Sequence, residues 1–70
     1  MKIKLYDVVA LLEDIPEKNL SRGQVGTLVE KLDDNIFEIE FSDDAGKTYA
    51  LVPVEAKNFL VLHYSNIKIA

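Results

Sequence analysis

The clearest regularity in the chain is a strict alternation of apolar and acidic side chains over residues 36–41. Phe37, Ile39 and Phe41 occupy alternate positions, and Glu38 and Glu40 stand between them. A repeat of two residues is typical of a β-strand with one buried and one solvated face. The pattern therefore predicts a strand over residues 36–41 that turns its three apolar residues toward a core.

The other apolar runs are separated by residues that favour turns. Further strands are predicted over residues 5–12, 24–32, 48–52 and 60–64. A long loop is predicted over residues 13–23, turns over 33–35 and 42–47, and one helical turn over 55–59. Gly26 predicts a bulge or a close backbone approach, and Pro53 is expected to end the pairing of its strand. This order predicts a small antiparallel barrel or sandwich.

Inward positions on these strands give a predicted core of ten residues. The core members are Val8, Ala10, Leu12, Val25, Val29, Phe37, Ile39, Phe41, Leu51 and Leu60.

The composition limits how such a domain can be stabilised and what it can bind. The chain has 70 residues, read as a single domain over 1–70 with residues 65–70 as a tail or an extra edge strand, and it has no cysteine. Disulfides, thiol catalysis and thiolate metal sites are therefore excluded. The net charge of −4 argues against nucleic acid and anionic lipid as partners. Because the chain has no signal peptide and no membrane-length apolar run, we expect a cytoplasmic protein.

Acidic residues are concentrated between Glu30 and Asp44, a segment with seven carboxylates and a single basic residue, Lys31. If the two central strands pair as a hairpin, several of these carboxylates share one sheet face and repel one another, and a basic partner would relieve that repulsion. The alternative is a solvated outer face that protects a sheet edge from aggregation. The candidate partner-binding residues are Glu30, Glu38, Glu40, Asp43 and Asp44.

No residue is predicted to be catalytic, cofactor-binding or metal-binding. Glu38 and Glu40 lie on an open strand without the cleft that a pair of catalytic carboxylates needs. The pairs Asp33-Asp34 and Asp43-Asp44 lack the spacing of a calcium loop and suit turns. His63, the only histidine, has no cysteine or serine motif near it and so lacks the partners that a nucleophile needs. The sequence therefore indicates a protein that is not an enzyme and needs no cofactor.

Several segments together resemble a family of short bacterial proteins catalogued as a domain of unknown function. The resemblance covers residues 5 to about 64, and the long first loop with the helical turn before the last strand is similar to an SH3-like barrel. It implies a five-stranded antiparallel SH3-like fold. The segments are Tyr6-Asp7-Val8-Val9-Ala10-Leu11, Ile15-Pro16, Arg22-Gly23-Gln24-Val25-Gly26-Thr27-Leu28-Val29-Glu30, Phe37-Glu38-Ile39-Glu40-Phe41-Ser42-Asp43 and Gly46-Lys47-Thr48-Tyr49-Ala50.

The resemblance implies a dedicated protein partner, because members of that family are often encoded beside another small protein, as in toxin–antitoxin modules. The first hypothesis is a protein-interaction module, an antitoxin or immunity-like neutraliser of a basic protein. Residues 23–29 also resemble strands of accessory subunits of photosynthetic and respiratory complexes. The alternative is therefore an accessory subunit held by apolar contacts through Val52, Val54, Ile67 and Ile69. A homodimer through the C-terminal tail stays open.

Overall fold

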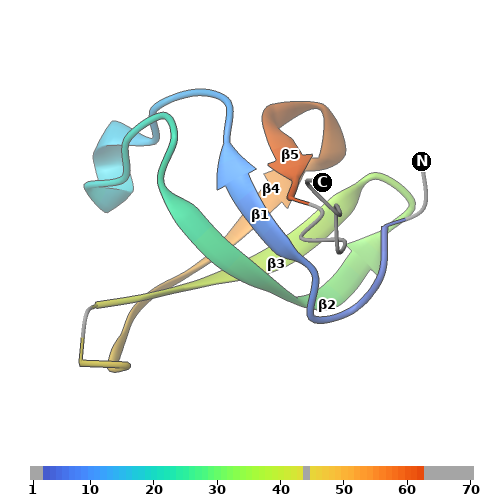
Figure 1. The fold of residues 1–70 in the computed structure, drawn as a ribbon. Coiled ribbons are helices and arrows are strands. Elements are labelled where there is room, and N and C mark those ends of the chain that lie inside the picture. Colours follow the sequence, from blue (N-terminus) through green and yellow to red (C-terminus); the bar gives the residue numbers. More distant parts are fainter. Residues whose placement is uncertain (1–2, 44, 63–70) are drawn as a thin grey trace, which may run out of the picture.

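A computed structural model of the protein describes residues 3–43 and 45–62. In these residues all strands belong to one antiparallel sheet, in the order β4-β3-β2-β1-β5 (Figure 1). The predicted all-β, five-stranded fold is confirmed, with its long first loop and its helical turn before the last strand. The elements are β1 (Val8–Leu11), the 3-10 helix η1 (Pro16–Lys18), β2 (Val25–Asp33), β3 (Ile36–Ser42), β4 (Thr48–Glu55), the 3-10 helix η2 (Ala56–Asn58) and β5 (Phe59–Val61).

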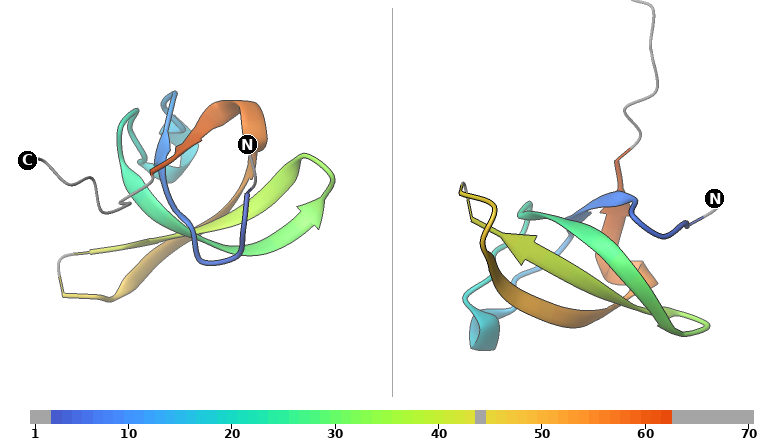
Figure 2. Two further views of the ribbon diagram at one scale, coloured as in Figure 1. Left: turned by 45° about the vertical axis from the view of Figure 1, so that its right-hand side comes forward. Right: turned by 90° about the horizontal axis from the view of Figure 1, so that it is seen from below.

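The long strand β2 joins the two halves of the sheet. Its first residues, from Val25 to Thr27, pair with β1, and the stretch from Thr27 to Asp33 pairs with β3. The register with β3 shifts between Leu28 and Glu30 and again between Lys31 and Asp33. Such bulges bend a strand and increase its twist. The sheet consequently curls around its inner face, so that β1 and β5 lie over the ribbon of β3 and β4 (Figures 1 and 2).

The core fills the inner face of this curled sheet. The rings of Phe37 and Phe59 meet edge to face with centroids 5.8 Å apart, a favourable aromatic arrangement. A Cβ on Gly26 would lie 2.7 Å from Ile39 Cγ2 and 2.8 Å from both the Glu40 carbonyl oxygen and Phe41 Cε1. The predicted close approach at Gly26 is therefore confirmed. The buried apolar residues are Val9, Leu11, Leu20, Leu28, Phe37, Ile39, Phe41, Val52, Val54, Phe59 and Val61.

The predicted core is correct on β3. On the other strands the prediction is shifted by one position along the chain, so that it names outward-facing residues. Phe37, Ile39 and Phe41 are buried as expected. The strands β1, β4 and β5 are apolar on both faces. Their sequences therefore do not show which alternate residues point toward the core. In β2 the small residue Gly26 takes an inward position that an apolar side chain was expected to fill. The predicted core residues that are instead partly or fully exposed are Val8, Ala10, Leu12, Val25, Val29, Leu51 and Leu60.

Pro53 does not end its strand, contrary to prediction, because β4 continues to Glu55. β4 lies at the edge of the sheet, where the missing N–H of a proline can face away from the neighbouring strand. The predicted tail over residues 65–70, together with His63 and Asp44, lies outside the described residues.

We expect Ile39→Ala and Leu51→Ala to differ sharply in stability. Ile39 is fully buried, so its truncation should lower the free energy of unfolding by about 2–5 kcal/mol. Leu51 is 51% exposed, and its truncation should change that free energy by only about 0.5 kcal/mol. Urea unfolding of both variants provides the measurement. Equal losses would contradict the register of β3 against β4.

Candidate functional site

The first loop, residues 12–24, is a compact folded segment. Leu20 turns its side chain into the core and is only 2% exposed. The Ile15 N–H donates to the Leu20 carbonyl at 2.8 Å, and the Leu20 N–H donates back to the Ile15 carbonyl at 3.1 Å. Between them Asn19 has a φ of 56°, a left-handed conformation that asparagine tolerates better than most residues. The loop therefore closes on itself around η1.

Hydrogen bonds at the base of the loop fix its position against the sheet. The Gly23 N–H donates to the Leu11 carbonyl at 2.7 Å, and the Leu12 N–H donates to the Asn58 carbonyl in η2 at 2.9 Å. Asp14 Oδ1 accepts the Arg22 N–H at 2.7 Å. These bonds join the two ends of the loop to each other and attach the loop to η2.

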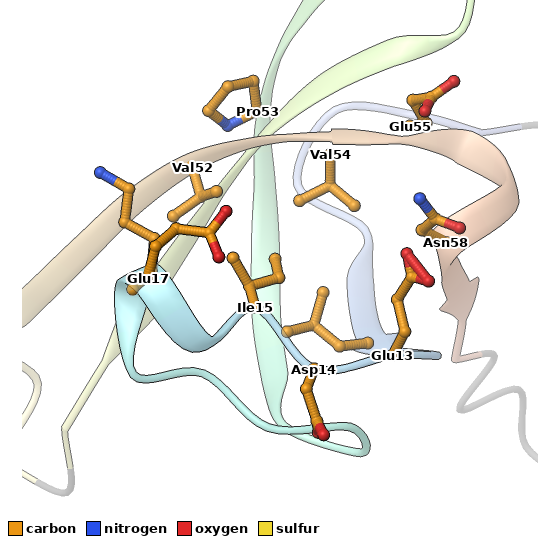
Figure 3. A pocket seen from close by; sticks show the side chains of 11 residues that line it. Glu13, Asp14, Ile15, Glu17, Val52, Pro53, Val54, Glu55 and Asn58 are labelled. Carbon is orange, nitrogen blue, oxygen red and sulfur yellow. The ribbon is translucent and has the colours of Figure 1, made fainter.

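A groove of about 370 Å³ lies between this loop and β4 (Figure 3). We call it the acidic groove. Its floor is apolar and its rim carries carboxylates from both the loop and β4. The floor consists of Leu11, Ile15, Val52 and Val54, and the rim of Glu13, Asp14, Glu17, Lys18, Pro53, Glu55 and Asn58.

The rim carboxylates differ in how far the protein itself uses them. Asp14 is engaged by the Arg22 N–H. Glu13, Glu17 and Glu55 are exposed, and none of them takes part in a side-chain hydrogen bond within residues 3–43 and 45–62. Glu13 and Glu17 thus stay available beside the apolar floor, whereas Glu55 extends from the opposite face of β4 (Figure 3). Lys18 is the single basic residue in the lining.

The predicted acidic face is present on the outer side of the sheet, opposite the core. Glu30 and Glu38 are direct cross-strand partners, and Glu38 also pairs with Pro53 of β4. Glu40 pairs with Thr27, one row further along β3. It accepts the hydroxyl hydrogen of Thr48 at 2.6 Å. The structure therefore places Glu30 and Glu38 side by side, whereas the Glu40 carboxylate is already hydrogen-bonded within the protein.

Asp43 belongs to the turn between β3 and β4. Its Oδ1 accepts the N–H groups of Ala45 and Lys47, each at 2.9 Å. Its own N–H donates to the Lys47 carbonyl at 2.9 Å. Asp43 thus shapes the turn, while Asp44 lies outside the described residues.

Sequence reasoning missed the acidic groove. Glu13 and Glu17 flank Ile15 in a segment without strand periodicity, and only the folded loop places them along β4. The available signal was the cluster of acids around an apolar residue in the longest loop, where binding residues are often found.

Within residues 3–43 and 45–62, histidine, aspartate and glutamate do not gather in a group of three or more suited to a metal ion. In the same residues no helix is both long enough and apolar enough to cross a membrane.

Fold and site together define a small, curled antiparallel β domain with an acidic groove between its first loop and an edge strand. Residues 5–61 match the family described as Domain of unknown function (DUF4926), and the chain belongs to this family. The predicted membership of a domain-of-unknown-function family is thereby confirmed. No curated protein and no solved structure matches the chain significantly.

Asp43→Ala and Asp43→Asn separate the turn role of this residue from a role of its charge. The alanine variant loses the acceptor of two N–H groups and should lower the free energy of unfolding by about 1–2 kcal/mol. The asparagine variant keeps a side-chain oxygen and should stay within about 0.5 kcal/mol of the original protein. Thermal or urea unfolding measures both. An equal loss in the two variants would show that the charge, and not the acceptor, supports the turn.

Proposed function

We propose that this protein is a non-catalytic interaction domain that binds and neutralises a basic partner protein, with the acidic groove as its main contact. The observation that carries the proposal is a groove with an apolar floor and the carboxylates of Glu13 and Glu17 at its rim, which the described structure leaves unbonded. Glu55 adds a third exposed carboxylate on the other face of β4. Apolar contact supplies binding energy, while the carboxylates select and steer a cationic surface.

The overall charge supports a basic partner. The chain carries twelve acidic and eight basic residues, for a net charge of −4. A surface of one sign raises the rate at which an oppositely charged protein arrives, and salt weakens this effect. An antitoxin or immunity-like role in the cytoplasm is our proposal for the biological setting.

A second candidate is supported by apolar residues on the outer face of the sheet. Val25 and Leu60 are 49% and 46% exposed, and both pair with Ala10 of β1. We call Val25, Ala10 and Leu60 the outer apolar row. An accessory subunit of a larger complex, photosynthetic or respiratory, would use such a row as a permanent contact. Val52 and Val54, which we expected to make that contact, are buried in the core instead.

Affinity capture from an extract of the protein's own host tests the proposal. We expect the immobilised protein to retain one basic protein at low salt and to lose it at high salt, because steering by charge is screened. Glu13→Gln/Glu55→Gln should lose that protein already at low salt. Glu30→Gln/Glu38→Gln removes the same charge from the outer face and serves as the matched control, which should retain the partner.

Other outcomes of the capture experiment would indicate a different contact face or a different function. Loss of the partner from Glu30→Gln/Glu38→Gln, with retention by the groove variant, would move the contact to the outer acidic face. Several subunits of one assembly retained at high salt, and released by Leu60→Ser, would favour the accessory subunit.

A further inference from the structure

The acidic groove changes its chemical character with depth. Leu11, Val52 and Val54 form its floor and are each at most 5% exposed, whereas the rim residues Glu13 and Glu55 are exposed. A side chain that fits both parts needs an apolar stem and a positively charged end. Lysine and arginine have this construction, since their methylene stems cover apolar surface while their charged heads stay at the rim.

One end of the groove brings two acceptors together. In Figure 3 the carboxylate of Glu13 points toward the side-chain amide of Asn58, while Glu55 extends from the opposite face of β4 above this end. Glu17 lies at the opposite end, with Ile15 between the two. The bond from the Leu12 N–H to the Asn58 carbonyl, 2.9 Å long, holds the loop and η2 together here. The acceptors that face this end, the Glu13 carboxylate and the Asn58 side-chain oxygen, therefore come from two segments that are fixed relative to one another.

We propose that this end of the groove binds the guanidinium group of an arginine in an extended, apolar-flanked segment of the partner protein. The proposal rests on the proposed function, whose partner it describes more closely. Arginine fits better than lysine because its planar guanidinium carries five donors and can engage a carboxylate and a second acceptor at once. The stem of the arginine would lie over Ile15, the one partly exposed residue of the groove floor.

The wall formed by β4 favours an extended segment held through its side chains. β4 is an edge strand, and within the described residues Val52, Pro53 and Val54 make no backbone hydrogen bond outside the ladder with β3. Pro53 has no N–H to offer, so a continuous sixth strand is interrupted at the centre of the groove. The bound segment consequently depends on the arginine and its apolar neighbours more than on its backbone.

Titration of the ¹⁵N-labelled full chain with two short peptides at low salt tests this proposal. The probes are Ac-Leu-Arg-Leu-NH₂ and Ac-Leu-Cit-Leu-NH₂, in which neutral citrulline replaces arginine at nearly the same shape. We expect saturable amide shifts confined to residues 12–18 and 52–58 with the arginine peptide. Because the charge-assisted bonds are lost, the citrulline peptide should bind at least about tenfold more weakly.

Two protein variants locate the contact. Glu13→Gln/Glu55→Gln should weaken binding of the arginine peptide by about tenfold or more, and Glu30→Gln/Glu38→Gln should change it by less than about twofold. The spectrum of each free variant shows whether its fold is intact. If Glu13→Gln/Glu55→Gln does not fold, Glu13→Gln alone provides the same comparison.

Three results would overturn the arginine assignment: equal binding of the two peptides, shifts centred on Glu30 and Glu38, or no saturable shifts. Each of them leaves the proposed function to be judged separately, because the capture experiment uses the whole partner. A partner that the groove variant loses, together with equal binding of the two peptides, would mean that the groove binds the partner by another group. A capture that retains no basic protein at low salt would contradict the proposed function itself.

Discussion

The burial of Leu20 is the contact on which the acidic groove depends. A loop as long as residues 12–24 loses much conformational entropy when it is ordered, and something must offset that loss. Leu20 contributes its buried side chain, and the two bonds between Ile15 and Leu20 close the loop above it. Once the loop is held, Glu13 and Glu17 face β4 from a fixed position. The groove therefore follows from a core contact made by a residue outside the strands.

The sequence predicts the fold more accurately than the phase of its strands. Alternating acids on β3 identify its inner face, and the turn residues on either side identify its ends. β1 has the run Val8–Leu11, apolar at every position, so the outward position of Ala10 is decided by the pairing of the strand and not by its composition. The same argument holds for Leu51 and Leu60. The outer apolar row exists because the chain has more apolar strand positions than its small core can enclose.

The candidate site illustrates a different limit of sequence reasoning. The acids from Glu30 to Asp43 are visible because they are close in sequence, yet the fold uses Glu40 and Asp43 in its own hydrogen bonds. The loop carboxylates Glu13, Asp14 and Glu17 are also close in sequence, but only folding places them along β4. What distinguishes them is the apolar floor beneath, because charge on an open strand face is well solvated and contributes little to affinity. Position relative to buried apolar surface, more than the number of acids, decides which face is suited to a partner.

Site-specific photocrosslinking in the native host tests the location of the partner most directly. A photoreactive amino acid replaces Lys18 at the groove rim in one version of the protein and Lys31 on β2 in another, since both positions are exposed. If the groove is the contact, the version with the probe at position 18 forms an adduct of one defined size, and the version with the probe at position 31 forms none. An adduct from position 31 alone would contradict the groove as the binding site.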